Sequence, residues 1–445
     1  MFSFKFLGKT RIPHHKNTTE IAPVKIAPPK EVLIPVSQHI GAPATPVVSV
    51  GDEVKVGQII AEASGFVSSP IHASVSGKVI KLEKYRSYDG RNIDAIRIES
   101  DSLMTKLETL VPPQITDVDS LVDAVAKSGI VGLGGAGFPT AVKLAALKKG
   151  NIHTVLINGA ECEPYITSDA RTMLDKSDLI FEAIKIFKAV APSVTKYIFG
   201  IEMNKPACIE EISRIFRDDP TVSVTPLPTL YPQGAEKVLM RNTTGLTVPE
   251  GKLPADVGVI VINVTTLATI AEYAKTGMPL VEKCITIDGS AVKEPKNLIC
   301  PIGTSIQDVI DFAGGLKEKA GKIIYGGPMT GRTACSTEEP IFKNTNAITI
   351  LSPADSLSRE ATACIHCGRC VDACPHLLVP TAFCKAVEIE NVDERAAKLE
   401  EYCINLCIEC GCCSYVCPAN RPLVQTNHIA KNLLKEYKSH KATLK

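Results

Sequence analysis

One cysteine pattern occurs twice in the last fifth of this chain and constrains its fold more than any other feature. The spacing Cys-x-x-Cys-x-x-Cys-x-x-x-Cys-Pro is made first by Cys364, Cys367, Cys370, Cys374 and Pro375, and again by Cys407, Cys410, Cys413, Cys417 and Pro418. Three thiolates on one tight turn can bind three irons of a [4Fe-4S] cluster, while the fourth cysteine reaches a second cluster. The pattern therefore predicts one cluster on Cys364, Cys367, Cys370 and Cys417, and another on Cys407, Cys410, Cys413 and Cys374.

Zinc is the alternative occupant of such a sulfur site. Two complete four-cysteine signatures favour clusters over zinc. Cys403 and Cys412 lie among the motif cysteines but fit neither spacing, so we expect that they bind no iron. We expect the other cysteines to be small buried apolar side chains: Cys162, Cys208, Cys284, Cys300, Cys335 and Cys384.

Composition restricts the remaining possibilities. The chain has 445 residues, of which 45% are apolar and 22% charged, so it can form several well-packed domains. A net charge of +1 gives no basic field, and nucleic acid is not an expected partner. No secretory signal is apparent, and sixteen cysteines then favour metal or redox chemistry over disulfides. The most apolar stretch, 257–268, is too short to span a membrane and is expected to be a buried strand and turn.

Local patterns predict a multidomain α/β protein with an additional small β domain. Residues 1–30 are rich in proline and charge and predict an extended arm that contains Pro13, His14, His15 and Lys16. The glycine turns at Gly51, Gly57 and Gly77 resemble the barrel-sandwich hybrid of biotinyl and lipoyl carrier domains. The matching hairpin tip, 62–65, has no lysine for attachment, so docking or scaffolding is a better expectation than a carrier role.

The expected boundaries follow the changes in pattern along the chain. We expect an arm at 1–30, a barrel-sandwich hybrid at 31–112, an α/β domain at 113–280, a β-grasp-like (SLBB) unit at 281–345, a helical two-cluster ferredoxin-like domain at 346–428, and a basic C-terminal helix and tail at 429–445. The helical stretches expected in the α/β domain include 120–126, 141–147 and 183–190, and its parallel strands include 154–157, 197–200 and 259–262.

A glycine-rich loop, 129–140, runs from Gly129 to Thr140 in the α/β domain and leads into an expected helix. Glycines let backbone N–H groups approach a phosphate, although this loop lacks both the dinucleotide-fold and the P-loop spacing. Its segment Gly-Gly-Ala-Gly-Phe-Pro-Thr closely resembles the flavin-binding loop of the NADH-oxidising flavoprotein subunit of respiratory complex I. Three more segments match that family in the same order, at 158–164, 234–237 and 261–267.

The whole chain, with its carrier-like domain and double cysteine motif, resembles the C subunit of the Rnf complex, a membrane-bound ferredoxin:NAD oxidoreductase. The resemblance implies non-covalent FMN contacts from Gly132, Gly134, Gly135, Ala136, Gly137, Lys143, Asn158, Gly234 and Asn263. It also implies that Phe138 stacks on a ring of NADH and that Glu163 hydrogen-bonds the nicotinamide, with Glu161 and Glu236 nearby.

Three positions depart from the family pattern. Leu133 stands where the family has arginine, and Ala160 and Ala235 replace acidic residues, so flavin affinity and potential can differ. By residue type alone, Glu161 and Glu163 could belong to an ordinary solvated acidic turn, and only the matched context favours a site.

The implied function is that of a peripheral electron-transfer subunit on the cytoplasmic side of the cell membrane. FMN would exchange hydride with NAD(H) and pass single electrons to two [4Fe-4S] clusters and to partner subunits, including an iron-sulfur subunit. One alternative is a soluble subunit of an electron-bifurcating hydrogenase or reductase. A second is a cluster-bearing scaffold with a degenerate flavin pocket. The coupling ion, the direction of electron flow and the choice between NADH and NADPH stay open.

Overall fold

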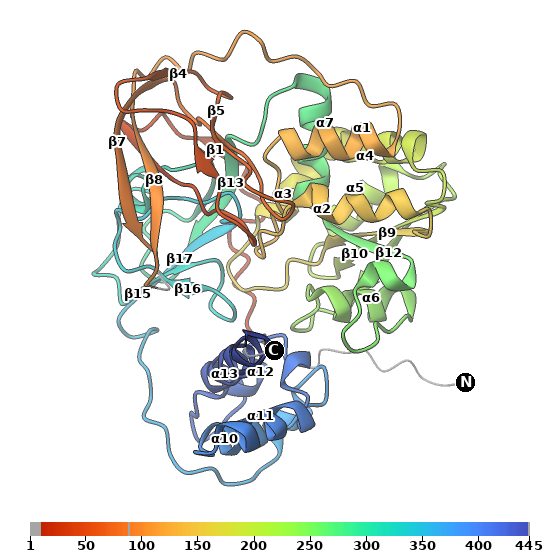
Figure 1. The fold of residues 1–445 in the computed structure, drawn as a ribbon, viewed down its shortest axis with the longest axis vertical. Helices are drawn as coiled ribbons and strands as arrows, with labels where there is room; N and C mark the ends of the chain where they lie inside the picture. The colour runs from red at the N-terminus through yellow and green to blue at the C-terminus, as the bar shows by residue number, and fades with distance from the viewer. Residues whose placement is uncertain (1–9, 88–89, 444–445) are drawn as a thin grey trace.

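Four sheets and a C-terminal helical domain make up the part of the chain that the computed structural model describes, residues 10–87 and 90–443 (Figure 1). The expected arm is therefore described from Thr10 onward, and Lys445 of the expected tail lies outside the described residues. In Figure 1 the red and orange β domain and the yellow-green α/β domain lie side by side, with the blue helical domain below them.

Two small antiparallel sheets form the first domain. One has the order β2 (Glu31–Pro35), β8 (Asn92–Ser100), β7 (Gly77–Arg86) and β4 (Glu53–Val54). The other has the order β3 (Thr45–Pro46), β5 (Ile59–Glu62) and β6 (Ile71–His72). Their inward-facing side chains, among them Ile34, Ile60 and Ile96, share one buried core, as expected for a barrel-sandwich hybrid.

A four-stranded parallel sheet organises the α/β domain. Its order is β11 (Val222–Leu227), β10 (Lys196–Glu202), β9 (Thr154–Gly159) and β12 (Val259–Asn263). The helices that accompany these strands include α1 (Val118–Lys127), α3 (Ser168–Asp175), α4 (Ser177–Val190), α5 (Pro206–Ile215), α6 (Glu236–Thr244) and α7 (Val264–Thr276). β9 and β12 are apolar runs because both faces of a parallel sheet are covered. Asn158 and Asn263 are paired in register near the carboxyl ends of these two strands.

Two local expectations in this domain need correction. The strand at 259–263 is not followed by a turn, because α7 begins at once with the Asn263 side chain accepting a hydrogen bond from Thr266 N at 3.1 Å. The expected helix at 141–147 is divided into α2 (Thr140–Leu144) and a 3₁₀ turn, Ala145–Lys149.

The third unit is a six-stranded mixed sheet with one helix, α8 (Ile306–Phe312), which is capped by Ser305. The strand order is β1 (Val24–Lys25), β14 (Lys296–Pro301), β13 (Glu282–Asp288), β17 (Ala347–Leu351), β15 (Lys322–Tyr325) and β16 (Arg332–Thr333). The expected boundary at 345 is therefore too early, because β17 lies between β13 and β15. β1 shows that the N-terminal arm also contributes to this sheet.

The C-terminal domain consists of α9 (Arg369–Asp372), α10 (Pro380–Val387), α11 (Val392–Glu401), α12 (Cys412–Tyr415) and α13 (Leu423–Thr443). Helix α13 runs through the expected boundary at 428, because Leu423, Ala430 and Leu434 are buried along its length. Lys431, Lys438 and Lys441 pair with Glu409, Glu400 and Asp393 of the same domain, so these three lysines of the expected basic tail fold back onto it.

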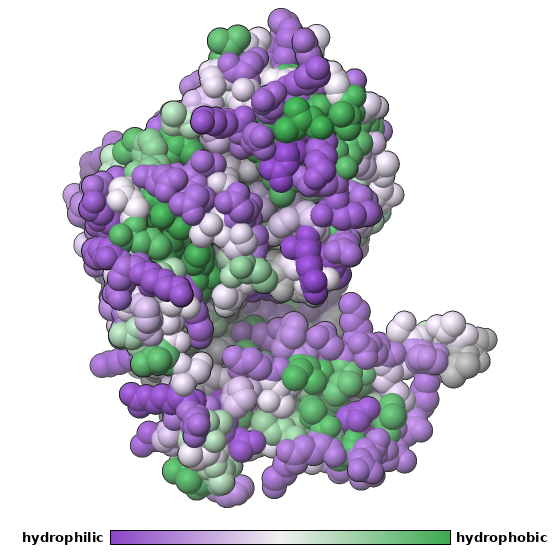
Figure 2. Space-filling view, turned by 90° about the vertical axis from the view of Figure 1, so that its left-hand side faces the viewer, coloured by the Kyte–Doolittle hydropathy of each residue, from purple (hydrophilic) through white to green (hydrophobic). Residues whose placement is uncertain are grey.

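Among the described residues, no helix combines the length and apolar character needed to cross a membrane. Figure 2 shows a largely hydrophilic face with several separate apolar patches.

Candidate functional site

The structure brings the eight motif cysteines together in the two sets that the spacing predicts. Cys364, Cys367, Cys370 and Cys417 line one cavity. Cys407, Cys410, Cys413 and Cys374 line a second one. The exchange of the fourth cysteine between the motifs is therefore present in the fold.

The two cysteine loops also share one backbone conformation. His366 and Glu409, at equivalent positions, have φ of 54° and 53°, and Gly368 and Gly411 have φ of 77° and 78°. This left-handed geometry wraps each loop around its cavity. His366 N approaches Cys364 Sγ at 3.4 Å, and Asn427 Nδ2 approaches Cys407 Sγ at 3.5 Å, as suits thiolates that accept hydrogen bonds.

The donor sets fit iron-sulfur clusters. Each set supplies four sulfurs around a cavity, and the thiolates of a cubane bind four different irons instead of one ion. Within the described ranges, no three His, Cys, Asp or Glu side chains are close enough together to hold a single metal ion.

The surroundings of the two loops differ. Residues 365–369 of the first loop are exposed, whereas Gly411, Cys412 and Cys413 of the second are buried. A Cβ on Gly411 would lie 2.8 Å from Met329 O in the turn between β15 and β16, whereas a Cβ on Gly368 would meet no atom within 4 Å. The second loop is thus packed against the rest of the protein, and the first faces outward.

Cys412 lies at this junction and also lines the second cavity, next to Cys410. It is buried in an apolar cluster with Ile12, Cys162 and Tyr231, and its Sγ lies 4.0 Å from Tyr231 O. A hydrogen bond from its thiol lowers the pKa of Cys410, while burial opposes this. That Cys412 binds no iron therefore stays a prediction from the motif spacing alone.

The glycine-rich loop presents unpaired N–H groups. Within the described part of the chain, no hydrogen bond joins the N–H of Gly134, Gly135 or Ala136 to another residue, and all three residues are exposed. Gly135 has φ of 119° and open space where a Cβ would be. Such a cradle of free amides fits an anionic cofactor group.

Several carbonyl groups of this loop accept hydrogen bonds from residues outside the α/β domain. Asn344 Nδ2 donates to Gly135 O at 2.7 Å, and Lys343 Nζ donates to Gly129 O at 2.8 Å. Ile40 N donates to Gly137 O at 3.1 Å. With their carbonyls fixed, the peptide groups of the loop have a defined orientation.

The other residues expected at the flavin surround this loop. Asn158 Nδ2 donates to Gly234 O at 2.9 Å, and the Gly134 Cβ position lies 3.0 Å from Asn263 Nδ2. Lys143 Nζ lies 2.7 Å from Glu236 Oε2 and 2.9 Å from Val261 O. Two other loop contacts, Gly132 N to Phe138 O at 2.8 Å and Gly137 N to Gly132 O at 3.2 Å, close the turn.

Glu161 and Glu163 do not form a solvated acidic turn. The Glu161 carboxylate is buried and accepts hydrogen bonds from Asp169 N at 2.6 Å and Ala170 N at 3.3 Å, at the start of α3. Burial raises the pKa of Glu161 to about 7, although Lys16 opposes the shift. This carboxylate therefore serves the loop's structure.

Glu163 is bound by the turn between β15 and β16. Its carboxylate accepts hydrogen bonds from Met329 N at 3.1 Å and from Thr330 N at 2.7 Å and Thr330 Oγ1 at 2.5 Å. Burial raises its pKa, and the bonds from Thr330 and Met329 oppose this. Met329 also abuts Gly411, so one turn touches both Glu163 and the second cysteine loop.

Leu133 is buried in the loop, and its carbonyl lies 3.4 Å from the ammonium of Lys283. Lys283 is 2% exposed, and burial lowers its pKa. A lysine from β13 thus brings positive charge near the position where the sequence lacks arginine.

Sequence reasoning missed several residues of this site. Lys16, Lys283, Thr330 and Asn344 reach it from other segments. Lys16 is expected only as part of an extended arm, and the sequence predicts no role for the other three. The expectation of burial is wrong for Cys335, which is exposed, and only partly met by Cys284, because neither is enclosed by a core.

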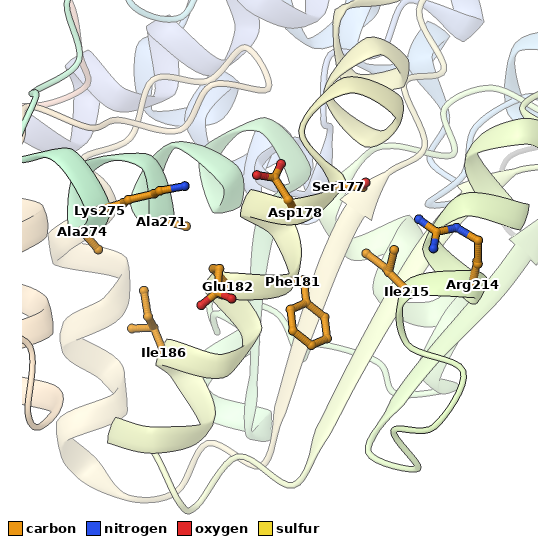
Figure 3. A pocket seen from close by; sticks show the side chains of 10 residues that line it. All are labelled: Ser177, Asp178, Phe181, Glu182, Ile186, Arg214, Ile215, Ala271, Ala274 and Lys275. Carbon is orange, nitrogen blue, oxygen red and sulfur yellow. The ribbon is translucent and has the colours of Figure 1, made fainter.

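A separate surface groove lies among α4, α5 and α7 (Figure 3). Phe181, Ile186 and Ile215 line it together with the charged Asp178 and Arg214. None of the expected site residues lines this groove, and we assign it no role.

Four family models match successive parts of the chain. They are the RnfC barrel sandwich hybrid domain at 4–103, the Nuo51 FMN-binding domain at 125–272, the SLBB domain at 284–333 and a 4Fe-4S dicluster domain at 360–421. The predicted fold class is confirmed by these matches.

Three curated relatives, each the C subunit of an oxidoreductase complex, are similar over most of their length. The chain is 44% identical to that of the proton-translocating ferredoxin:NAD(+) oxidoreductase complex of Clostridium ljungdahlii, over 84% of this chain and 83% of the relative. It is 43% identical to the C subunit of the Na(+)-translocating ferredoxin:NAD(+) oxidoreductase complex of Acetobacterium woodii, over 84% of this chain and 85% of the relative. It is 38% identical to the C subunit of the ion-translocating oxidoreductase complex of Rhodobacter capsulatus, over 99% of this chain and 85% of the relative.

Proposed function

Because this chain belongs to the Rnf family of C subunits of ion-translocating ferredoxin:NAD(+) oxidoreductase complexes, we propose that it exchanges electrons between NAD(H) and the one-electron carriers of such a complex. The observation that carries this proposal is one junction. The turn at Met329 and Thr330 contacts both Glu163, beside the flavin-site residues, and Gly411 of the second cysteine loop.

FMN and two [4Fe-4S] clusters are the cofactors of this chemistry, and the residues present fit both. When bound, FMN exchanges a hydride with NAD(H) and single electrons with the clusters. The free amides of Gly134, Gly135 and Ala136 would hold FMN, with side-chain contacts from Asn158, Asn263 and Lys143. The cluster ligands would be Cys364, Cys367, Cys370 and Cys417 for one, and Cys407, Cys410, Cys413 and Cys374 for the other.

The protein's own contribution is positioning. Asn344, Lys343 and Ile40 donate hydrogen bonds to carbonyls of the glycine-rich loop and so hold the loop in one conformation. Glu163 would orient the nicotinamide, and its carboxylate is held by three hydrogen bonds from Met329 and Thr330. Phe138 would stack on a ring of NADH. No side chain needs to act as a general acid or base.

The two cysteine loops suggest an order for electron transfer. The second loop is buried beside the flavin-site residues, while residues 365–369 of the first are exposed. We infer that the first loop faces a partner that holds iron-sulfur clusters. The expected position of the chain is peripheral, on the cytoplasmic side of the cell membrane. The relatives are named for different ions, so similarity does not decide between protons and sodium.

Affinity purification from detergent-solubilised membranes tests the assignment to a membrane complex. We expect the tagged chain to co-purify with membrane-spanning subunits, and the complex to couple oxidation of reduced ferredoxin to NAD reduction. If the chain instead purifies from the soluble fraction together with hydrogenase subunits, the bifurcating alternative replaces this proposal.

A further inference from the structure

The N-terminal arm lies along the loops that carry Glu163 and Gly234. Thr10 and Tyr231 exchange backbone hydrogen bonds of 3.3 Å and 2.8 Å, next to the turn that carries Gly234. Tyr165 N donates to His14 O at 3.0 Å, and the His15 ring stacks on Tyr165 at a centroid distance of 4.7 Å. The arm is therefore part of the site's frame and not a free extension.

Lys16 makes the most extensive of these contacts. Its ammonium donates to Glu161 O at 2.7 Å, to Glu163 O at 2.8 Å and to Ile166 O at 2.5 Å. A lysine ammonium has three N–H donors, so all of them are used on one loop. Burial lowers the pKa of Lys16 to about 8, while Glu161 opposes the shift and Lys205 adds to it.

The loop that Lys16 binds needs such support. Glu161 and Tyr165 have φ of 46° and 69°, a left-handed conformation that residues with side chains seldom adopt. Lys205 Nζ also donates a hydrogen bond to the adjacent Ala160 O at 2.6 Å. Carbonyls that converge on a cation keep this strained turn in place.

Lys16 also completes the fixation of Glu163. The carboxylate of Glu163 is bound by Met329 and Thr330 in the turn between β15 and β16, and its backbone carbonyl is bound by Lys16. Without Lys16, the side chain would still have its partners, but the backbone that carries it would be released. The position of the Glu163 carboxylate therefore depends both on its side-chain hydrogen bonds and on the backbone hydrogen bond from Lys16.

We propose that Lys16 is a positioning residue for the dinucleotide site, which holds the 161–166 loop so that Glu163 meets the nicotinamide. The proposal rests on the proposed function, because it assumes that NAD(H) binds at this loop. It predicts that loss of the ammonium weakens NADH binding while FMN and both clusters are retained.

The test uses the full chain reconstituted with FMN and clusters, with NADH oxidation followed by reduction of ferricyanide. We expect Lys16→Met to raise the KM for NADH at least about tenfold with less than about a twofold change in kcat. Lys16→Gln, which keeps two donors, should raise KM less. Arg11→Met is the matched control, since Arg11 is an exposed cation on the same arm. It should behave as the wild type.

The outcomes separate the proposal from the proposed function. If the wild-type chain holds FMN and clusters but does not oxidise NADH, the proposed function fails and this inference falls with it. If the wild type is active and both Lys16 variants have its KM, only the positioning role is overturned. If both variants lose FMN and clusters together, Lys16 serves folding, and the positioning role is likewise overturned.

Discussion

At the scale of single residues, the site depends on backbone groups more than on reactive side chains. The glycine-rich loop offers free N–H groups, and the 161–166 loop is held through its carbonyls by Lys16 and Lys205. The carboxylate of Glu161 is occupied by the start of α3. Substitutions that move the backbone should therefore affect cofactor binding more than substitutions that only remove a charge.

Gly135→Ala should weaken FMN binding. Its φ of 119° lies in a region where a side chain is strained, at a cost of about 1–3 kcal/mol. We expect FMN affinity, measured by fluorescence quenching, to fall roughly tenfold. Gly51→Ala is the matched control, because Gly51 has φ of 103° and equally open space outside the site. Equal loss of FMN affinity in both variants would refute the assignment of this loop.

Acid should weaken the packing of the first domain against the α/β domain. Burial, followed by the charge of Lys343, lowers the pKa of His72 to about 3. An unfolded chain takes up this proton below about pH 6.5, and the folded one does not, so stability is lost as the pH falls from 6.5 towards 3. Between pH 7 and 5.5, the free energy of unfolding should therefore fall by about 1 kcal/mol less in His72→Gln than in the wild type.

Thermal unfolding of both chains at the two pH values measures this difference. His440→Gln, at an exposed position of α13, serves as the control and should lose stability with acid as the wild type does. An identical acid response in His72→Gln and the wild type would contradict the assignment.

At the scale of elements, the two cysteine loops are the part of the site that the sequence predicts best. Ligand spacing is a local property, so the two sets of four follow from the chain without knowledge of its fold. The helical and strand patterns of the α/β domain are equally local. Here β9, β10 and β12 lie where the apolar runs predict them.

Comparison of Cys410→Ala with Cys412→Ala should distinguish an iron-binding cysteine from a nearby cysteine that binds no iron. Loss of Cys410 should remove one cluster, so the iron content falls from about eight to about four per chain. Cys412 lies in an apolar cluster and should be replaceable with about eight irons retained. Iron and sulfide analysis after anaerobic reconstitution gives the answer. Loss of iron from Cys412→Ala alone would reverse the ligand assignment.

The contacts between elements could not be predicted from the sequence. β17 lies between β13 and β15, beyond the expected domain boundary at 345. β1, in the N-terminal arm, pairs with β14, which lies more than 250 residues later in the chain. Lys16 and Asn344 reach the site for the same reason, since only tertiary packing brings them there. A single lysine or asparagine in a loop carries no pattern that would reveal such a partner.

At the scale of the whole molecule, four parts of the chain meet at one place. The arm, the α/β domain, the six-stranded sheet and the second cysteine loop contribute Ile12, Cys162, Met329 and Cys412 to one apolar cluster. The flavin-site residues and the second cysteine loop are therefore held in fixed positions relative to each other. We attribute the electron-transfer function to this arrangement.

Gly411→Ala should disturb this relation, and Gly368→Ala should not. The two glycines have nearly the same φ, but only a Cβ on Gly411 would approach Met329 O, at 2.8 Å. We expect stopped-flow absorbance to show slower reduction of the clusters by NADH in Gly411→Ala, by about tenfold or more. Reduction by dithionite should be unaffected in either variant. Equal rates with NADH in both variants would show that this contact does not matter.

An anaerobic NADH titration of the reconstituted chain, with absorbance and EPR recorded together, tests electron transfer from NADH through FMN to the clusters. We expect flavin absorbance to bleach on mixing and signals of reduced iron-sulfur clusters to follow. A chain that carries both clusters but binds no FMN and does not respond to NADH would contradict this function, and the scaffold alternative would then stand.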